Sequence, residues 1–321
     1  MKQKFINQVN IEGYVYQHSL EVKTVKDSQS ENFGKEFING DLDIAVDEEG
    51  LNVVTVHYTY VTPFTKQGKP NRNYDILKNI IDNNKTWLNV GKDGATKVQC
   101  QTSFGLNDFY SRDGQLVSQM VQEGGFISTI GQFSDKRNRF DIDLLVTSVT
   151  HVEADEEKNI PEDYCTIRGA GFDFKKAILP MTFKLSDSKG MDWFESLDAS
   201  STNPVFLKVW GEVNSISTKI VKREESAFGE DSVKTYDKKV KEWLITGASP
   251  IPYDFGDETV LTAAEVQKAL QDREVLLADV KRRSEEYKAS KAAAPSVAPA
   301  PAKSNAPAFN FYGGELWRHL I

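Results

Sequence analysis

The first part of the chain alternates apolar and polar residues in short runs, which is the period-two pattern of β-strands. Residues 9–15 form the first run, with Gly13 inside it, and residues 37–46 form the second. The clearest run is 51–62, because β-branched and aromatic residues fill it until Pro63 ends it. We therefore predict three strands before residue 63.

Helical spacing replaces this alternation over residues 74–81. Strand character returns at 97–109, and 117–130 is expected to form a strand pair with Gly124 and Gly125 between its two members. Three strands, a short helix and further strands are typical of a small Greek-key barrel such as an OB-fold. A β-sandwich is the alternative.

A second β-rich unit is expected beyond residues 151–163, an acidic segment that we interpret as a linker or long surface turn. The pattern predicts strands at 164–174, 177–185, 205–221 and 239–248, a short helix at 191–197 and a polar hairpin at 224–238. Both units contain a Gly-x-Val piece, beginning at Gly13 and Gly211, which does not establish an internal repeat. We predict a mainly β protein with OB-like domains at 1–150 and 164–255.

The C-terminal region changes character three times. Residues 262–290 begin with the capping box Thr262-Ala-Ala-Glu265 and carry charge pairs at i,i+4, which predicts an α-helix. Residues 292–308 are rich in Ala and Pro and are expected to form a flexible linker. The last 13 residues, 309–321, are apolar again, and their candidate partner-binding side chains are Phe309, Phe311, Leu316, Trp317 and Leu320. A peptide that docks on a partner protein is one interpretation; folding back onto the body and a non-native addition are the others.

Composition restricts the class of protein. No apolar run approaches the roughly 20 residues of a membrane-spanning helix, and the opening residues lack the apolar core of a signal peptide. Two cysteines, Cys100 and Cys165, cannot form a disulfide framework, which fits a reducing compartment. We expect a cytoplasmic protein without a membrane partner, in the host cytoplasm if it is phage-encoded.

Known catalytic motifs are missing from the sequence. It contains no G-x-S-x-G elbow and no closely spaced histidine pair, and the Gly91–Gly94 segment lacks phosphate-loop spacing. His57 is expected to be an ordinary strand residue, and Asp41 and Asp43, which share a strand face, are the remaining candidates for a metal nuclease. We therefore predict a protein that is not an enzyme, with no cofactor and no metal site.

Charge is distributed unevenly along this chain of net charge −8. Residues 51–112 carry 8 Lys/Arg against 4 Asp/Glu, which predicts a local phosphate-binding patch. Aromatic and basic residues interleave there, as single-strand binding requires, since bases stack on rings while cations follow phosphates. The candidate nucleic-acid-binding residues are Tyr58, Tyr60, Phe64, Lys66, Lys69, Arg72, Tyr74, Lys85, Trp87, Phe109 and Arg112. For Tyr58 and Tyr60 a core position is an open alternative, because they share a strand face with Val54 and Val56.

Three parts of the chain resemble phage-type single-stranded DNA-binding proteins: residues 7–13, the Val-rich strand at 53–61 and the aromatic-basic segment after it. Residues 225–230 also look like phage replication-associated proteins of this type. The succession of barrel, linker and terminal peptide is similar to bacterial single-stranded DNA-binding proteins, whose terminal peptide recruits replication and repair proteins. This sequence departs from that pattern, because Glu315 is the one acid in its tip.

These observations favour a non-catalytic protein that coats and protects single-stranded DNA during phage-type replication or recombination. Its first barrel would bind the strand, its terminal peptide would recruit replication or recombination proteins, and a homo-oligomer is left open. The second unit is expected to contribute little, since residues 151–260 carry 14 Lys/Arg against 21 Asp/Glu. The alternatives are a virion structural or assembly protein built of β-domains and, less favoured, an enzyme acting on nucleic acid.

Overall fold

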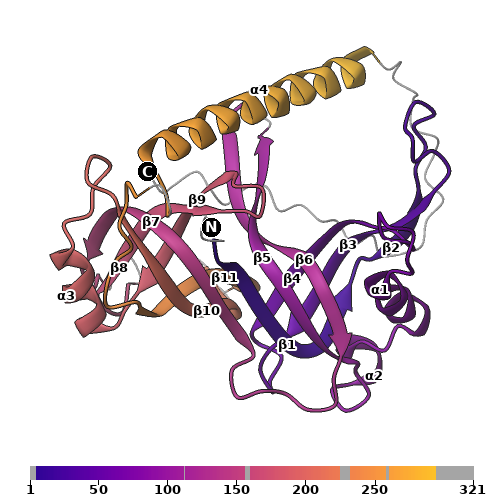
Figure 1. The fold of residues 1–321 in the computed structure, drawn as a ribbon. Helices are drawn as coiled ribbons and strands as arrows, with labels where there is room; N and C mark the ends of the chain where they lie inside the picture. The colour runs from indigo at the N-terminus through magenta and orange to yellow at the C-terminus, as the bar shows by residue number, and fades with distance from the viewer. Residues whose placement is uncertain (1–4, 112, 156–159, 225–231, 258–259, 294–321) are drawn as a thin grey trace.

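The structure is a computed structural model that describes residues 5–111, 113–155, 160–224, 232–257 and 260–293 (Figure 1). Within these ranges the strands form one 11-stranded sheet. The strands are β1 (Asn7–His18), β2 (Glu21–Thr24), β3 (Glu36–Ala45), β4 (Val53–Val61), β5 (Lys97–Tyr110), β6 (Leu116–Thr129), β7 (Asn138–Val152), β8 (Tyr164–Phe172), β9 (Ile178–Leu185), β10 (Val205–Glu224) and β11 (Ser232–Ala248). The helices are α1 (Arg72–Asn83), α2 (Trp87–Val90), α3 (Ser188–Ser196) and α4 (Ala263–Ala293).

The first barrel closes in the order β1–β3–β4–β6–β5–β1. All of its pairs are antiparallel except β4–β6, which is parallel. Helices α1 and α2 lie between β4 and β5, the position that the helix takes between the third and fourth strands of an OB-fold. Alternate side chains such as Val9, Ile11 and Val15 of β1 fill the barrel interior and are fully buried.

The second barrel repeats this plan with β7–β8–β9–β11–β10–β7. Its single parallel pair is again third strand to fifth, β9–β11, and α3 again lies between the third and fourth strands. Met191 and Phe194 anchor α3 on the barrel core. The barrels are joined because their first strands, β1 and β7, pair antiparallel, and one hydrophobic core runs through both.

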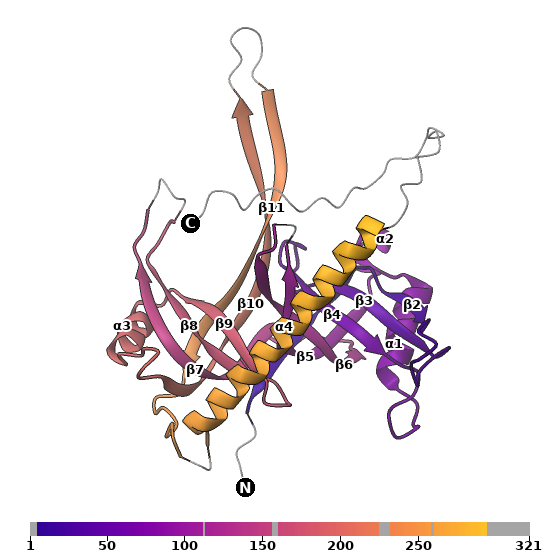
Figure 2. The same cartoon turned by 90° about the horizontal axis from the view of Figure 1, so that it is seen from above.

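Two elements connect the barrels further. The base of the β10–β11 hairpin reaches the first barrel, where the Ser215 N–H donates to Asn52 Oδ1 at 2.8 Å and the Ser217 N–H donates to the Leu51 carbonyl at 3.0 Å. Helix α4 crosses both halves, and the hairpin projects far from the body (Figure 2). Arg273 of α4 donates to both carboxylate oxygens of Asp108 in β5, at 2.9 and 3.1 Å.

The prediction of a mainly β protein with OB-like barrels and a C-terminal helix is confirmed. The first two residues of the predicted linker, 292 and 293, belong to α4, and the rest of the linker and the terminal peptide lie outside the described residues. One element prediction is wrong: the predicted strand pair at 117–130 is the single strand β6, which ends at Thr129. Strands β2 and β7 and the short helix α2 were not predicted. Because β7 begins the second barrel, we propose a boundary between the barrels at 130–137 in place of 150–164.

Candidate nucleic-acid interface

The basic loop after β4, residues 64–72, folds into an ordered hairpin. Phe64 pairs with Pro70 as an isolated bridge, and the Thr65 N–H donates to the Lys69 carbonyl at 2.8 Å. Gly68 takes φ 75°, a conformation that glycine adopts without the steric cost of a side chain, and its N–H closes the turn onto Thr65. Lys66, Lys69 and Phe64 are therefore held outward, and Phe64 is 60% exposed.

Two asparagines fix this loop on the barrel. The Asn71 side chain caps α1 by accepting from the Asn73 N–H, and its amide donates to the Thr62 carbonyl at 2.8 Å. The Asn73 side chain then pairs with the β6 backbone, donating to the Gly125 carbonyl at 3.0 Å and accepting from the Ile127 N–H at 3.2 Å. The loop is thus positioned beside β6, far away in the sequence.

A groove of about 570 Å³ opens between the loop and the sheet. Phe126 of β6, 72% exposed, presents its ring there, and Arg72 provides a cation. The lining is Asn10, Thr65, Pro70, Asn71, Arg72, Asn73, Gln99, Gln101, Phe126, Ile127 and Ser128. Cations, an exposed ring and amide side chains can meet phosphates, base faces and base edges respectively.

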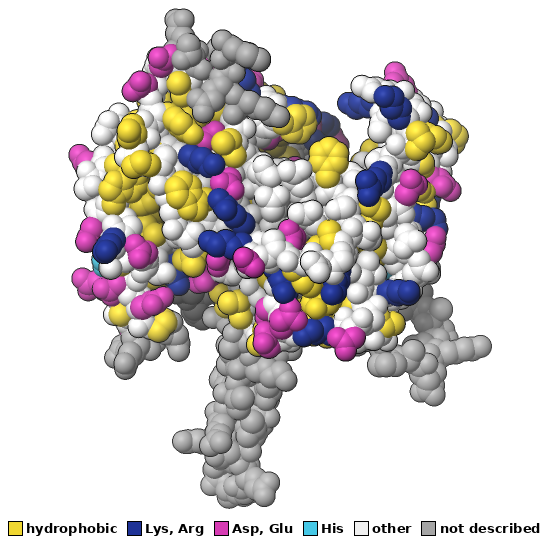
Figure 3. Space-filling view, turned by 60° about the horizontal axis from the view of Figure 1, so that its bottom comes forward, with side chains coloured by type: hydrophobic (Ala, Val, Ile, Leu, Met, Phe, Trp, Pro, Cys, Tyr) yellow, Lys and Arg dark blue, Asp and Glu magenta, His cyan; other side chains and the backbone are white. Residues whose placement is uncertain are grey.

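Amide side chains continue this surface across neighbouring strands. Asn10 of β1 lies opposite Gln101 of β5, which lies opposite Phe126 of β6. Gln99 donates to the buried Glu12 carboxylate at 2.9 Å. Figure 3 shows one face of the molecule, on which Lys and Arg are dispersed among acidic and hydrophobic side chains instead of forming a single basic patch.

The α2 end of the first barrel holds a cluster of rings and cations around Tyr14. The Tyr14 ring meets Trp87 edge-on at 5.4 Å between centroids and Phe133 at 4.9 Å. Arg137 lies over the Phe133 ring at 4.1 Å. Glu48 accepts from Lys92 at 2.7 Å and from Arg137 at 2.6 Å, and these hydrogen bonds lower the pKa of Glu48 to about 2. The cluster is largely satisfied internally, which favours a packing role.

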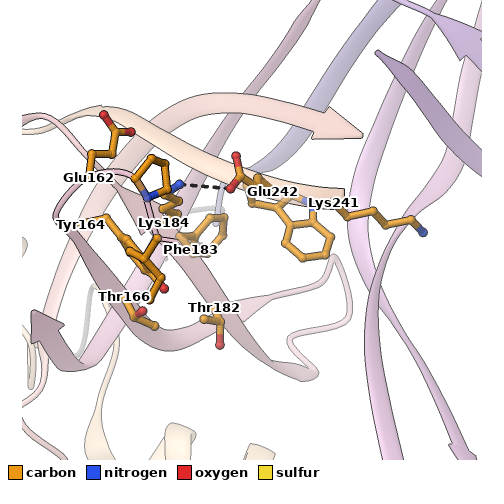
Figure 4. Close-up of a pocket in the computed structure, with 11 residues that line it drawn as sticks. Glu162, Tyr164, Thr166, Thr182, Phe183, Lys184, Lys241 and Glu242 are labelled. Carbon is orange, nitrogen blue, oxygen red and sulfur yellow. Dashed lines mark hydrogen bonds and ion pairs between the residues drawn. The ribbon is translucent and has the colours of Figure 1, made fainter. Parts of the chain in front are cut away.

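A second groove, of about 480 Å³, lies on the second barrel (Figure 4). Its floor is the outer face of β8 and β9, the second and third strands, which is the face that OB-folds use for oligonucleotides. Lys184 lies over the Tyr164 ring at 4.9 Å and donates to Glu242 at 3.1 Å, so its charge is compensated. Lys241 points away from Lys184 (Figure 4). Burial lowers the pKa of Lys241 and Lys239 adds to the shift, against the opposing effect of Asp43 and Asp41 of the first barrel.

Comparison with known proteins assigns the chain to a family. The family model YorF matches residues 6–283, which include both barrels and most of α4. The chain is a member of the YorF family. No curated protein matches this YorF-family chain. A solved structure of a deletion mutant of the single-stranded DNA binding protein from Thermus aquaticus is similar over 79% of this chain and 98% of that chain, with 11% sequence identity and a TM-score of 0.45.

Two predicted site residues of the YorF-family chain lie in the core. Tyr58 is 1% exposed, packs on Gly124 and approaches the Cys100 thiol at 3.6 Å, and burial raises its pKa. Tyr74 is 8% exposed and donates to Glu36 at 3.4 Å. The structure therefore corrects their placement on a stacking surface, because neither ring has an open face. Tyr60, in contrast, is 45% exposed and stacks beside Phe37 at 4.7 Å.

The other predicted residues are divided between separate places. Phe64, Lys66, Lys69 and Arg72 share the loop beside the groove, and of these four Arg72 lines the groove itself. Trp87 belongs to the Tyr14 cluster, with exposed Lys85 before it. Phe109 is 41% exposed near the β5–β6 turn and follows Asp108, the residue that bonds to Arg273 of α4. The structure therefore does not bring Trp87 or Phe109 to the groove. Arg112 and the terminal residues Phe309, Phe311, Leu316, Trp317 and Leu320 lie outside the described residues.

Sequence reasoning missed the sheet side of the groove. Gln99 and Gln101 stand two positions apart on β5, and Phe126 directly follows Gly124 and Gly125. An aromatic residue next to two small residues was therefore the available sequence signal for this part of the groove.

Asp41 and Asp43, the residues considered for a nuclease, are engaged in hydrogen bonds: Asp41 with His57 Nδ1 at 2.6 Å and Asp43 with the Thr55 hydroxyl at 2.5 Å. No helix among the described residues is long and apolar enough to cross a membrane.

Proposed function

We propose that this chain binds single-stranded DNA without catalysis and coats it during phage-type replication or recombination in the host cytoplasm. The observation that carries the proposal is the anchored basic loop beside a groove that contains an exposed aromatic ring. Phosphates would pair with Lys66, Lys69 and Arg72, while bases would stack on Phe126 and Phe64 and meet the amides of Gln99 and Gln101.

The shape of this groove favours single strands. A stacking platform next to dispersed cations suits unpaired bases, whose faces are open, whereas duplex DNA presents phosphates and base edges alone. The overall charge of −8 opposes nonspecific duplex binding. A terminal peptide that recruits replication or recombination proteins, and a homo-oligomeric coat, are further parts of the proposal.

The test is fluorescence anisotropy of a labelled oligo-dT of about 30 nucleotides, against the matching duplex, at several salt concentrations. We expect binding to the single strand to be tighter and to weaken with salt. The variant Lys66→Ala/Lys69→Ala/Arg72→Ala should lose about 30- to 100-fold in affinity at 0.1 M salt, and its salt slope should fall by about 2, because each phosphate contact contributes about 0.7. Phe126→Ala should lose about 5- to 150-fold with an unchanged salt slope.

The matched control is Lys189→Ala/Lys268→Ala/Lys281→Ala, which removes three exposed charges from α3 and α4. If the control weakens binding as much as the loop variant, the effect is general charge and the groove assignment is wrong. If the wild-type chain does not bind the oligonucleotide at low salt, the proposal is wrong. Ordered self-association without DNA would then favour the assembly-protein alternative.

A further inference from the structure

A side-chain cluster at the α3 end of the second barrel has the composition of a metal site. His151 of β7 lies directly opposite Cys165 of β8 in the strand register, and Glu195 of α3 closes over both. The His151 Nδ1 lies 2.8 Å from Glu195 Oε1, and the Cys165 Sγ lies 3.4 Å from Glu195 Oε1 and 4.0 Å from His151 Nδ1. Among the described residues this is the one group of three or more His, Cys, Asp and Glu side chains close enough to share an ion.

We propose that His151, Cys165 and Glu195 bind one zinc-like divalent cation, with the fourth position open to water. Imidazole nitrogen, thiolate sulfur and carboxylate oxygen are the three donor types that Zn²⁺ takes from proteins. With usual zinc–ligand lengths, the donors of a tetrahedral site stand about 3.3–3.6 Å apart. The three measured separations bracket that range, so binding needs shifts of roughly half an ångström, which side-chain rotation supplies.

A second carboxylate stands where a metal-bound histidine needs one. Asp163 Oδ2 lies 3.9 Å from His151 Nε2, on the side of the ring away from the proposed ion. The Ala154 N–H donates to Asp163 Oδ1 at 2.7 Å and holds this carboxylate in place. Metal-binding histidines usually direct their second nitrogen at such a carboxylate, which fixes the ring tautomer and strengthens the ligand.

Access and charge also suit a cation. The His151 and Glu195 side chains are 41% and 43% exposed, so an ion and its water can enter from solvent, while Cys165 lies at the buried bottom of the site. The carboxylates of Asp163 and Glu153 interact electrostatically with His151, and the carboxylate of Asp192 interacts electrostatically with Cys165. A dication would balance the thiolate and the Glu195 carboxylate. It would also tie α3 to the first two strands of the barrel, a role that does not depend on DNA binding.

Cobalt titration of the full chain tests whether His151, Cys165 and Glu195 bind a metal ion. The protein is freed of metal with a chelator, kept reduced with a phosphine and titrated with Co²⁺, which occupies zinc sites and reports thiolate ligation by a near-ultraviolet charge-transfer band. We expect one equivalent of Co²⁺ to produce this band and the visible bands of a tetrahedral ion, and Zn²⁺ to remove them. Zn²⁺ should also raise Tm, since it binds the folded state.

Cys165→Ser should abolish the charge-transfer band, and Cys100→Ser, which alters the buried cysteine of the first barrel, should retain it. In case Cys165→Ser does not fold, Glu195→Gln keeps the thiol and changes an exposed side chain; it should weaken Co²⁺ binding at least 10-fold. Asp163→Asn should weaken it about 10- to 100-fold. The proposal is overturned if folded wild-type protein gives no charge-transfer band, if Cys165→Ser retains it, or if Glu195→Gln binds Co²⁺ as tightly as wild type.

Discussion

The two barrels share strand order, the parallel third-to-fifth pair and the position of their helices, yet their outer faces differ. On the second and third strands of the first barrel, Asp41 and Asp43 bond to His57 and Thr55. The matching face of the second barrel carries Tyr164, Thr166 and Arg168 on β8, with Lys184 on β9. The same backbone therefore presents acids in one case and a ring with cations in the other.

The surroundings of these faces differ as well. In the first barrel the base of the β10–β11 hairpin lies against this side: Trp243 Nε1 can donate to Gln122 of β6, and Asn52 before β4 bonds to Asn214. The groove of the first barrel lies instead on β1, β5 and β6, where the loop at 64–72 is anchored. Barrel topology alone thus does not locate a binding surface; neighbouring elements and side chains do.

The largest expected effect is on stability, at one glycine in each barrel that lies against the backbone of a neighbouring strand. A Cβ at Gly13 would stand 2.1 Å from the Ala45 carbonyl oxygen, and one at Gly211 would stand 1.9 Å from that of Leu244. Gly13→Ala and Gly211→Ala should each lower the free energy of unfolding by about 1–3 kcal/mol, because a neighbouring backbone must move. Gly131→Ala, where no atom lies within 4 Å, should be neutral or slightly stabilising.

Urea unfolding followed by both circular dichroism and tryptophan fluorescence measures these changes. Since the β1–β7 pairing and the shared core join the barrels, the two signals should change together in all variants. Two separate transitions in Gly13→Ala would show instead that the barrels unfold independently.

The strands were predictable where local pattern and tertiary role agree. Residues 53–61 are β-branched and aromatic, and they form β4. The missed strand β7 carried a similar signal, since Phe140, Ile142, Leu144 and Val146 recur at every second position and are fully buried. The two Gly-x-Val pieces do not occupy matching positions, because Gly13 lies on the first strand of its barrel and Gly211 on the fourth.

Close packing explains the element that was predicted wrongly. Gly124 and Gly125 suggested a turn, but a Cβ on Gly124 would meet the Tyr58 ring at 2.4 Å, and one on Gly125 would meet the Gln101 carbonyl at 2.3 Å. These glycines thus permit close contact inside one strand. The groove could not be predicted, because it depends on Asn73 reaching β6, some 50 residues later in the chain. Local patterns indicated the basic loop but not the surface beside it.

A smaller effect is expected from the outer face of β8 and β9 in the second barrel. The variant Tyr164→Ala/Arg168→Ala/Lys184→Ala should lower oligo-dT affinity by less than about 3-fold, because the Lys184 charge is already compensated by Glu242, and exposed charges contribute little when paired. The same anisotropy assay compares it with the loop variant. A loss above about 10-fold with the loop variant unchanged would move the main binding surface to the face that other OB-folds use.

The smallest effect concerns acid stability at the α2 end of the first barrel. Hydrogen bonds from Lys92 and Arg137 lower the pKa of Glu48 from 4.5 to about 2. A carboxylate with a lowered pKa stabilises the folded state above its unfolded pKa, and this contribution disappears as the pH falls from about 4.5 toward 2. Glu48→Gln should therefore be slightly less stable than wild type near pH 7, by about 0–1 kcal/mol because the group is half exposed, and the difference should vanish toward pH 2. Urea midpoints of both proteins across this range measure it, and added salt should reduce the gap at pH 7. A gap that persists unchanged at low pH would mean that Glu48 acts through packing with the Tyr14 cluster and not through its charge.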